Sequence, residues 1–554
     1  MESDRQKTVS PAPLSLAQAY AALAAHQPDG VALWTAGGAI TRAELDEQSR
    51  RVAAGFAKLG VRRGDRVAIW LPNVPAWLVC FLALARLGAI AIATNTRFRS
   101  REIADIWSRA GVKGVVFWPH YRNIEFARLL QGARDELPAL DFLIAYEDTG
   151  PGGAAADASA VHGLDVPTLP YAALAGEAPY TEDQGEASLP VVTFTTSGTT
   201  GRPKLATHTQ ASILRHAEAV APAFGFSDPG ACVLQMLPFC GTYGLAQTMA
   251  ALYAGTPMVM QHTFDPPAAA ALMRAHHTTH GCMNLDLVER IYAVAGDPVS
   301  LPRMKFFMGA TGMPLAERED RLGFRLRGLY GSSEVQALYS LQDDVGDPMA
   351  RISGGGQPVS AQSRVRARKT ADAPEAPGIQ PHGEWGELEF FGPGVMAGYL
   401  NDPQATARAF TDDGWFRSGD LGYTLADGSF RFVSRMGDAI RLGGFLVDPH
   451  EIETFIEEFR GIETCQVVGV EIEGRTRAVA FYTCMPPEEG AVIEVAEAEL
   501  RQHCREGLAA YKTPQHFVQL EEFPVVVSAN NTKIRRAELR NMAERLLKGG
   551  AAPA

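Results

Sequence analysis

Residues 193–204 read Thr-Phe-Thr-Thr-Ser-Gly-Thr-Thr-Gly-Arg-Pro-Lys, and this stretch decides how the rest of the chain is interpreted. It follows the apolar run 189–192 and consists mainly of hydroxyl side chains and glycines before Lys204. Glycine accepts positive φ, so consecutive backbone N–H groups can converge on an anion. A solvated Ser/Thr/Gly linker is the ordinary alternative, but it explains neither the preceding strand nor the closing Arg-Pro-Lys. The stretch therefore predicts a phosphate-binding loop. It is not a Walker loop, because Leu205 follows the lysine where Ser or Thr would stand.

The part of this stretch that reads TSGTTGRPK, residues 196–204, resembles the signature loop of the acyl-adenylate-forming superfamily. That superfamily contains acyl-CoA synthetases, adenylation domains of peptide synthetases and luciferases. Its members activate a carboxylic acid with ATP, release pyrophosphate, and then hand the acyl group to a thiol. The resemblance implies that nucleotide binding in this loop involves Thr196, Ser197, Gly198, Thr199, Thr200, Gly201 and Lys204.

Composition narrows the class of protein. A chain of 554 residues with 46% hydrophobic residues can bury more than one core, and its formal net charge of -12 argues against a nucleic-acid or anionic-membrane partner. Seven scattered cysteines without a CxxC pair favour a reducing cytosol over a disulfide scaffold or a zinc site. The N-terminus lacks the apolar core of a signal peptide, and the run 77–93 is too short and mixed to span a bilayer. We therefore expect a soluble, cytoplasmic protein.

Alternating strand and helix signals predict the fold of the N-terminal part. A helix is expected at 77–87, and strands are expected at 66–71, 89–93, 112–117 and 142–146. This order indicates an α/β fold, with a large wound domain of largely parallel strands. We expect residues 147–188 to form a long surface connection without a function of its own.

The second half of the chain predicts two further parts. Beyond a Pro-rich interruption at 369–382, a β-rich subdomain is expected. The pattern changes near Arg435 to a compact α+β arrangement, which the resemblance identifies as a small mobile domain. We therefore expect an N-terminal domain over residues 1–434 that binds ATP and the acid, and a C-terminal domain over 435–554 that carries a catalytic lysine.

Residues 328–334, Gly-Leu-Tyr-Gly-Ser-Ser-Glu, resemble the YGxTE motif of the superfamily. A tight turn at Gly331 would present the side chains after it on one side. The resemblance implies that Tyr330 stacks on adenine, that Ser333 approaches the α-phosphate and that Glu334 supports Mg²⁺. Magnesium keeps several waters, so one protein carboxylate together with phosphates suffices. Taken alone, the segment is equally consistent with a structural turn. The other nucleotide-binding residues expected in this region are Ala310, Thr311, Gly331 and Ser332.

Two further segments resemble the ribose-binding and hinge motifs of the superfamily. Residues 415–420, Trp-Phe-Arg-Ser-Gly-Asp, are similar to W-x-x-T-G-D, and Asp420 is implied to accept hydrogen bonds from the ribose hydroxyls. Residues 434–438 are similar to the hinge region, in which Arg435 would make a second ribose contact. Gly437 stands where the hinge usually carries Lys or Asp. Because glycine absorbs large φ/ψ changes, we expect it to serve as the hinge.

The C-terminal part carries two more motifs. Residues 442–447 match a glycine-rich loop that faces the active site during thioester formation, although a β-hairpin without a ligand explains them equally well. The loop residues expected to face CoA are Gly443, Gly444 and Phe445. Residues 529–536 resemble the N-G-K-I/V-x-R motif and place Lys533 at its invariant lysine. An ammonium there would stabilise the negative charge on the leaving pyrophosphate. The expected catalytic residues are Lys533, Glu334 and Lys204.

The resemblance implies that the acid pocket lies between residues 237–244 and 281–285. Its lining is mainly apolar, without a basic residue for a second carboxylate and without the aspartate that amino-acid adenylating domains use for an α-amine. A fatty, alicyclic or aryl acid is therefore the expected substrate. The expected pocket residues are Phe239, Cys240, Gly241, Tyr243, Cys282, Met283 and Gly309.

Three functions stay open at this point. The first is an acyl-CoA ligase that uses ATP, Mg²⁺ and coenzyme A, which the stand-alone length favours. The second is an acyl-adenylate synthetase that loads a separate carrier protein. The third, a non-catalytic nucleotide or acyl sensor, is disfavoured because the five motif residues Lys204, Glu334, Asp420, Arg435 and Lys533 occur together. A homodimer is compatible with the sequence, but nothing requires one.

Overall fold

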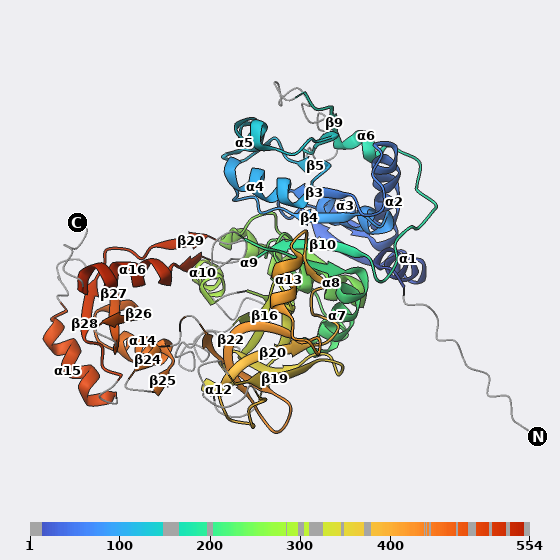
Figure 1. Ribbon diagram of the computed structural model, residues 1–554. Helices are drawn as coiled ribbons and strands as arrows, with labels where there is room; N and C mark the ends of the chain where they lie inside the picture. The colour runs from blue at the N-terminus through green and yellow to red at the C-terminus, as the bar shows by residue number, and fades with distance from the viewer. Residues whose placement is uncertain are drawn as a thin grey trace, which may run out of the picture.

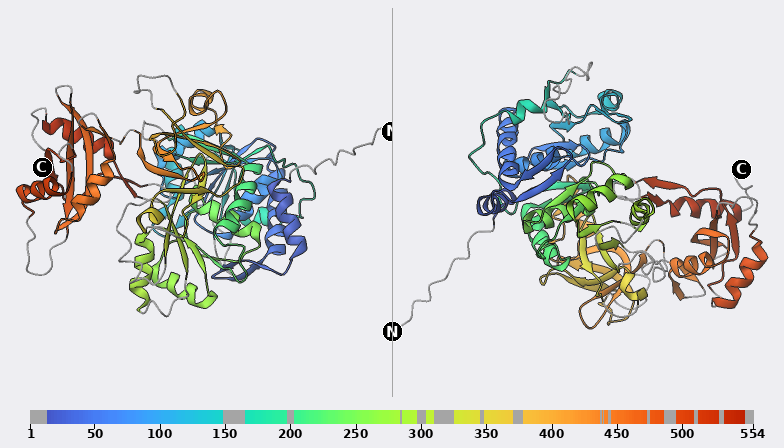
Figure 2. Two further views of the ribbon diagram at one scale, coloured as in Figure 1. Left: turned by 90° about the horizontal axis from the view of Figure 1, so that it is seen from below. Right: turned by 180° about the vertical axis from the view of Figure 1, so that it is seen from behind.

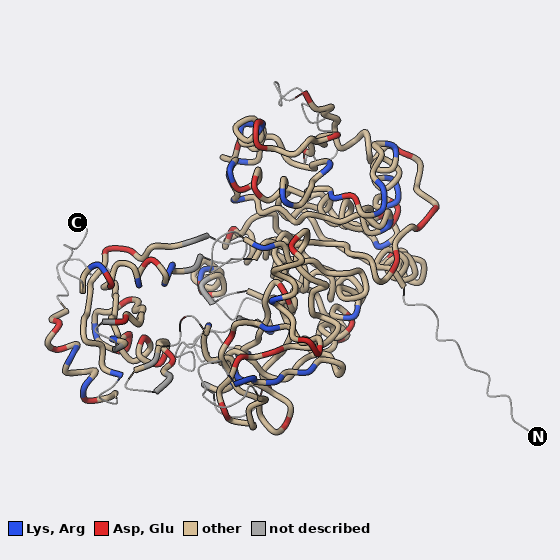
Figure 3. The backbone as a smooth tube through the Cα atoms, viewed as in Figure 1, with Lys and Arg blue, Asp and Glu red and all other residues tan. Residues whose placement is uncertain are grey.

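The computed structural model describes residues 14–147, 165–196, 203–283, 285–296, 304–309, 325–344, 348–369, 378–436, 438, 440–442, 445–472, 475–485, 495–508, 512–527 and 532–547. Figures 1 and 2 show a larger body, coloured from blue to orange, and a smaller red domain at one side of it. Acidic and basic residues are interspersed along both parts (Figure 3), so the net charge of -12 is spread over the chain. Within the described ranges, no helix is long and apolar enough to cross a membrane.

An eight-stranded sheet contains the strand that leads into the phosphate-loop stretch. Its order is β21-β11-β10-β4-β3-β5-β8-β9, and all neighbours from β10 to β9 are parallel. Buried residues run without interruption along most of these strands, as expected where helices cover both faces of a parallel sheet. The strands are β3 (Arg66–Trp70), β4 (Ile90–Ala93), β5 (Gly114–Phe117), β8 (Phe142–Ala145), β9 (Thr168–Pro170), β10 (Pro190–Thr195), β11 (Leu205–Thr209) and β21 (Gly398–Tyr399).

Successive side chains of this sheet enter two different hydrophobic cores. Val67 and Ile69 pack with α2 and α3, whereas Ala68 and Trp70 pack with α4 and α5. Because side chains alternate between the two faces of a strand, the helices form a layer on each face. This arrangement confirms the predicted wound α/β fold. The helices here are α1 (Leu16–His26), α2 (Arg42–Lys58), α3 (Pro75–Arg86), α4 (Ser100–Ala110) and α5 (Phe126–Ala133), with a 3-10 turn η1 (Arg134–Glu136) and the short pair β6 (His120–Tyr121) and β7 (Ile124–Glu125).

The expected surface connection over residues 147–188 is wrong in part. Residues 168–170 form β9, which extends the sheet by pairing in parallel with β8, and α6 (Tyr171–Ala175) follows it. Leu174 of α6 is buried against α2, where a Cβ added to Gly55 would lie 2.8 Å from the Leu174 Cβ. Both elements are too short to give a periodic signal, so their apolar residues were not predicted to be structured. Residues 148–164 lie outside the described ranges.

A thirteen-stranded sheet forms the second layer of the larger body. In its parallel part the strands lie in the order β16-β15-β14-β12-β13-β1. On the other side of β16 the order is β17-β18-β23-β22-β20-β19, and all of these neighbours are antiparallel. The predicted β-rich subdomain is the antiparallel part, and β18 joins it to the parallel part by pairing with both β17 and β23. The strands are β1 (Val31–Thr35), β2 (Gly38–Thr41), β12 (Val233–Gln235), β13 (Met258–Met260), β14 (His280–Cys282), β15 (Lys305–Gly309), β16 (Leu326–Ser332), β17 (Gln336–Leu341), β18 (Gly355–Pro358), β19 (Arg364–Arg368), β20 (Gly386–Phe391), β22 (Phe416–Thr424) and β23 (Phe430–Arg435).

Helices α7 and α8 pack in a core to which strands of both sheets contribute. They pack against each other within the large core that also contains α2 and α3, and both contact β17. The start of α7 is capped by Thr209, whose hydroxyl accepts from the Ser212 N–H. The helices around this junction are α7 (Gln210–Ala223), α8 (Thr242–Ala254), α9 (Pro266–His276), α10 (Leu285–Ala295), α12 (Pro348–Ile352) and α13 (Pro403–Ala409).

The C-terminal part has the predicted α+β architecture. A three-stranded sheet, β26-β27-β28, lies between a core shared with α14 and α15 and a second core shared with α16. The hairpin β29–β30 extends from this domain toward the larger body, near α10 (Figures 1 and 2). The elements are β24 (Ile440–Leu442), β25 (Phe445–Val447), α14 (Pro449–Glu457), β26 (Ile462–Ile472), β27 (Arg475–Cys484), α15 (Glu497–Gly507), β28 (His516–Gln519), β29 (Val525–Val527), β30 (Thr532–Ile534) and α16 (Arg536–Leu547).

Candidate active site

The phosphate-loop stretch connects two antiparallel strands, β10 and β11. Its base is closed by two hydrogen bonds: the Thr196 N–H donates to the Lys204 carbonyl at 2.9 Å, and the Lys204 N–H donates to the Thr196 hydroxyl at 3.2 Å. These bonds hold the two ends of the loop together. The strand before the loop, β10, is buried along most of its length, as predicted. Ser197, Gly198, Thr199, Thr200 and Gly201 lie outside the described residues, so phosphate binding by them stays a prediction.

Lys204 and Glu334 contact the same tyrosine, Lys204 over its ring and Glu334 at its hydroxyl. The Lys204 ammonium lies 4.6 Å from the centroid of the Tyr399 ring, and the Tyr399 hydroxyl donates to Glu334 Oε1 at 3.1 Å. Burial, and after it the Glu334 carboxylate, raises the pKa of Tyr399, so the phenol keeps its proton. The sequence analysis did not find Tyr399, because its only local signal is an isolated Gly-Tyr pair. Its position follows from the pairing of β21 with β11.

The segment 330–334 differs from its prediction in the position of the turn. Gly331 lies within strand β16, and the turn covers residues 333–335. A glycine is needed at 331 for another reason: an added Cβ would lie 2.5 Å from the Ala337 Cα on the neighbouring strand. Ser332 stabilises the turn, because its hydroxyl accepts from the Glu334 N–H at 3.2 Å.

Tyr330, Asp420 and Arg435 contact one another and form one group, and their roles at the nucleotide stay predictions. The Tyr330 hydroxyl donates to Asp420 Oδ2, and Arg435 Nε lies 2.9 Å from Asp420 Oδ1. Asp420 and Arg435 are register partners on β22 and β23. Burial acts to lower the pKa of Arg435, but the charge of Asp420 and its neighbours raises it overall, whereas burial and Asp420 both raise the pKa of Tyr330. This site therefore holds a fixed carboxylate between a phenol and a guanidinium.

The Tyr330 ring is buried among aromatic side chains. It stacks on Phe390, with ring centroids 5.0 Å apart and planes 14° apart, and Phe430 contacts it edge-on at 5.3 Å. One ring face is therefore occupied by Phe390. Adenine stacking on Tyr330 stays a prediction.

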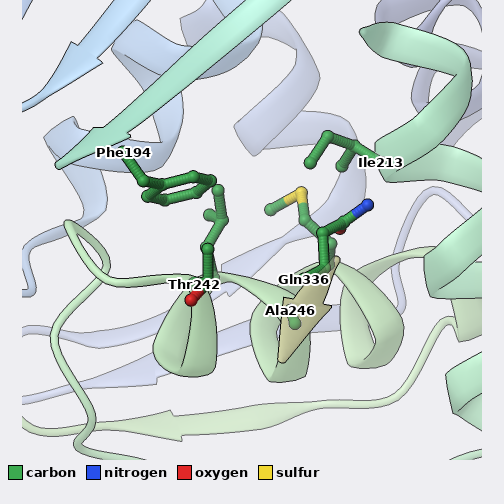
Figure 4. A pocket seen from close by; sticks show the side chains of 7 residues that line it. Phe194, Ile213, Thr242, Ala246 and Gln336 are labelled. Atoms are coloured by element: carbon green, nitrogen blue, oxygen red, sulfur yellow. The ribbon is translucent and has the colours of Figure 1, made fainter. Parts of the chain in front are cut away.

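A small, mainly apolar pocket lies between α7 and α8 (Figure 4). In Figure 4, Phe194 and Ile213 lie on one side of it, and Thr242, Ala246 and Gln336 on the other. Its lining residues are Phe194, Ile213, Thr242, Leu245, Ala246, Met249 and Gln336. Gln336 is held in place, because its amide Nε2 donates to the Ser212 carbonyl at 3.1 Å.

None of the seven predicted pocket residues belongs to this lining, although Gly241 and Tyr243 flank Thr242. The Phe239 N–H donates to Asn73 Oδ1 at 2.9 Å, and the Cys282 N–H donates to Gln247 Oε1 at 2.6 Å. Four of the predicted residues are buried in hydrophobic cores. Phe239, Cys240 and Cys282 belong to the large core that contains α2, α3, α7 and α8, and Met283 belongs to the core around α9 and α10. Gly309 ends β15, opposite Leu329. A role in acid binding stays a prediction for all seven.

Two buried histidines lie behind the turn at 333–335, and the sequence analysis missed both. His208 Nε2 lies 2.8 Å from the Ser333 carbonyl oxygen, and His216 Nε2 lies 2.7 Å from the Ala337 carbonyl oxygen. Burial lowers the pKa of each imidazole to about 4, so both rings are neutral at neutral pH.

The predicted C-terminal site residues are described only in part. Lys533 lies on β30 opposite Val526, and Phe445 lies on β25 opposite Leu442. Gly437, Gly443, Gly444, Ala310 and Thr311 lie outside the described residues, and the roles of all these positions stay predictions. Next to the expected hinge, the Met436 N–H donates to the Gly419 carbonyl at 2.9 Å.

Two family models match the chain. Residues 20–400 match the AMP-binding enzyme family, and residues 451–530 match the AMP-binding enzyme C-terminal domain. Similar proteins include Triostin synthetase I of Streptomyces triostinicus, which is 29% identical over 505 residues that cover 90% of this chain and 89% of that protein. Sulfoacetate–CoA ligase of Cupriavidus necator is 29% identical over 540 residues, covering 96% and 98%. The crystal structure of ATP-bound MatB from Rhodopseudomonas palustris superimposes with a TM-score of 0.77 at 25% identity, covering 96% of this chain and all of that one.

Proposed function

This chain belongs to the AMP-binding enzyme family, and on that premise we propose that it is an AMP-forming carboxylic acid–CoA ligase. The observation that carries the proposal is that charged residues from four separate motifs converge through two tyrosines, Tyr399 and Tyr330. The four are Lys204, Glu334, Asp420 and Arg435. The names of relatives that span nearly the whole chain, among them a CoA ligase, support the same reaction class.

The proposed reaction has two steps. First, a carboxylate oxygen of the acid attacks the α-phosphorus of ATP, the bond from that phosphorus to pyrophosphate breaks, and acyl-AMP forms. The CoA thiolate then attacks the acyl carbonyl carbon, and the bond to AMP breaks. In this scheme Lys204 and Lys533 stabilise phosphate charge, while Asp420 accepts hydrogen bonds from the ribose hydroxyls. Because Tyr330 and Arg435 already fix the Asp420 carboxylate, its position needs no reorganisation when the nucleotide binds.

Glu334 fits a magnesium ion that is shared with nucleotide phosphates. It is a half-buried carboxylate, and one of its oxygens is oriented by Tyr399. No group of three or more His, Cys, Asp or Glu side chains in the described segments could hold a metal by itself. Magnesium binds through one or two carboxylates together with substrate phosphates, which suits a single Glu334. When bound, the ion would neutralise part of the phosphate charge.

We place the domain boundary at residues 434 and 435, and we propose that the C-terminal domain rotates between the two steps. Strand β23 of the larger sheet ends at Arg435, and the core of the small domain begins with Ile440. Few residues separate these points, so a hinge at Gly437 would change the position of the hairpin that carries Lys533 without disturbing either core.

We propose a fatty, alicyclic or aryl acid as the substrate, and the apolar lining of the small pocket between α7 and α8 supports this class. Five of its seven lining side chains are apolar, and Thr242 and Gln336 are the polar ones. None of the seven is basic, so the pocket offers no partner for a second acidic group on the substrate. An apolar pocket discriminates by only about 1–3 kcal/mol per methylene, so acids of neighbouring length should also react.

The test is pyrophosphate release from ATP and Mg²⁺ across a panel of carboxylic acids, with and without CoA. Release that requires an acid, and that turns over repeatedly only with CoA, is the expected result. Acid-dependent release that is indifferent to CoA would favour a carrier-protein thiol, the second candidate, which the similarity to Triostin synthetase I keeps open because that name does not specify CoA. Absence of release in a folded protein that binds ATP would refute both.

A further inference from the structure

His208 and His216 face the same segment of the proposed active site from β11 and α7. His208 is fully buried and His216 is 2% exposed, and neither side chain lines the pocket. Their partners, the Ser333 and Ala337 carbonyls, are 125 and 121 residues away in the chain. The two histidines therefore join the element that follows the phosphate loop to the turn that carries Glu334.

The hydrogen bonds of His208 define which ring nitrogen carries the proton. A carbonyl oxygen can only accept, so Nε2 must donate to Ser333. Nδ1 then accepts from the Ser212 hydroxyl, which lies 3.3 Å away. The ring also lies edge-on to Phe194, a pocket residue, with centroids 5.9 Å apart. Both ring nitrogens of this buried side chain are thus hydrogen-bonded: Nδ1 to Ser212, and Nε2 to the Ser333 carbonyl next to Glu334.

His216 holds a strained part of the same segment. The residues on either side of its partner Ala337 have positive φ, 62° at Gln336 and 66° at Leu338. Side-chain-bearing residues rarely adopt this conformation, and it persists only where the surroundings hold it in place. The hydrogen bond from His216 to the carbonyl between these two residues is such a restraint. Gln336 is also a pocket residue, so this restraint fixes a wall of the pocket.

We propose that His208 and His216 are positioning residues for the segment 333–337. His208 fixes the position of the part that faces the nucleotide, and His216 fixes the position of the part that faces the acid. The inference rests on the proposed function, since it assigns Ser333 and Glu334 to the nucleotide and Gln336 to the acid. Neither histidine touches a reacting atom. Their separate partners predict that the two can be distinguished by kinetics.

The test compares His208→Ala and His216→Ala with the matched variants His208→Gln and His216→Gln. The amide nitrogen of glutamine can reach the position of Nε2, so it can restore the donor to the carbonyl. Affinity for the non-hydrolysable analogue α,β-methylene-ATP with Mg²⁺ is measured by calorimetry, and the KM of the best acid is measured by pyrophosphate release. We expect His208→Ala to weaken analogue binding by about 10- to 100-fold, as the loss of a group that orients a ligand-binding residue typically does, and to change the acid KM less, through the ring contact with Phe194.

We expect His216→Ala to do the reverse, raising the acid KM while the analogue affinity stays within about threefold of the parent, and we expect each glutamine variant to recover most of its loss. Thermal unfolding of all four variants checks that they are folded. Two results would overturn the inference: parent-like affinity in folded His208→Ala, or equal effects of the two alanine variants on nucleotide and acid. If the parent binds the analogue but converts no acid, the proposed ligase function fails, whereas the analogue affinity of His208→Ala still decides the inference.

Discussion

Replacing Asp420 by asparagine should weaken ATP binding, because the carboxylate has two oxygens that face two different donors. Oδ2 accepts from Tyr330, and Oδ1 faces Arg435 Nε at 2.9 Å. Asparagine keeps the volume but has only one acceptor oxygen, so its amide NH₂ must face one of the two donors. The change therefore removes an interaction without opening a cavity.

The size of the effect follows from the exposure of the two partners. The Arg435 side chain is 45% exposed, so water screens its ion pair and its contribution is small. Tyr330 is buried, and a hydrogen bond to a charged group contributes about 1.5–3 kcal/mol. A ribose hydroxyl that donates to the same carboxylate would make a hydrogen bond of this class, so its loss should lower the affinity for ATP by about 10- to 150-fold, since 1.4 kcal/mol is tenfold.

Calorimetric titration with ATP and Mg²⁺ measures this loss directly. Affinity is the better readout for this variant, because it reports nucleotide binding itself. Asp412→Asn, at an exposed position shortly before β22, removes the same charge and should bind like the parent. Parent-like affinity in Asp420→Asn would refute the assignment of Asp420 to the nucleotide.

Three other changes test separate parts of the account. Lys533→Ala should slow acid-dependent pyrophosphate release by about 100-fold while leaving thioester formation from supplied acyl-AMP intact; equal losses in both assays would contradict its role. Tyr399→Phe removes the donor to Glu334 but keeps the ring beneath Lys204, so the Mg²⁺ concentration for half-maximal rate should rise, and an unchanged Mg²⁺ titration would exclude this coupling. Burial raises the pKa of Asp448 from 3.8 in the unfolded chain to about 6 in the folded protein. Between these two pH values the folded state keeps a proton that the unfolded state has lost, so the free energy of unfolding falls as the pH rises from about 4 to about 6. Asp448→Asn, which keeps the helix cap to His450, should therefore melt higher than the parent at pH 7, and this gain should vanish below pH 4; a gain that is equal at both pH values would contradict the titration.

The parts of the site that were predictable are those encoded by local motifs. Asp420 and Arg435 were assigned from two adjacent segments, and they meet because β22 and β23 are neighbouring antiparallel strands with a short connection. The parallel strands around Val67 were predictable because runs of buried residues alternate with helices. Local chemistry and short-range periodicity were sufficient in both cases.

The parts that were missed depend on contacts between distant segments. Tyr399 reaches Glu334 because a two-residue strand adds to β11, and no local pattern specifies that pairing. His208 is a single buried histidine whose partner is 125 residues away. The turn was placed at Gly331 because glycine usually indicates a turn, whereas this glycine accommodates the close approach of Ala337 on the next strand. In each case tertiary pairing decides the role of the residue, and sequence spacing does not reveal it.

The central claim is that a carboxylate oxygen of the acid becomes bonded to the α-phosphorus of ATP. The most direct measurement uses an acid with both carboxylate oxygens labelled with ¹⁸O, incubated with ATP, Mg²⁺ and CoA, followed by mass spectrometry of the nucleotide product. We expect AMP that carries one ¹⁸O atom, formed in equal amount with acyl-CoA. Unlabelled AMP, or ADP together with ¹⁸O in inorganic phosphate, would contradict it.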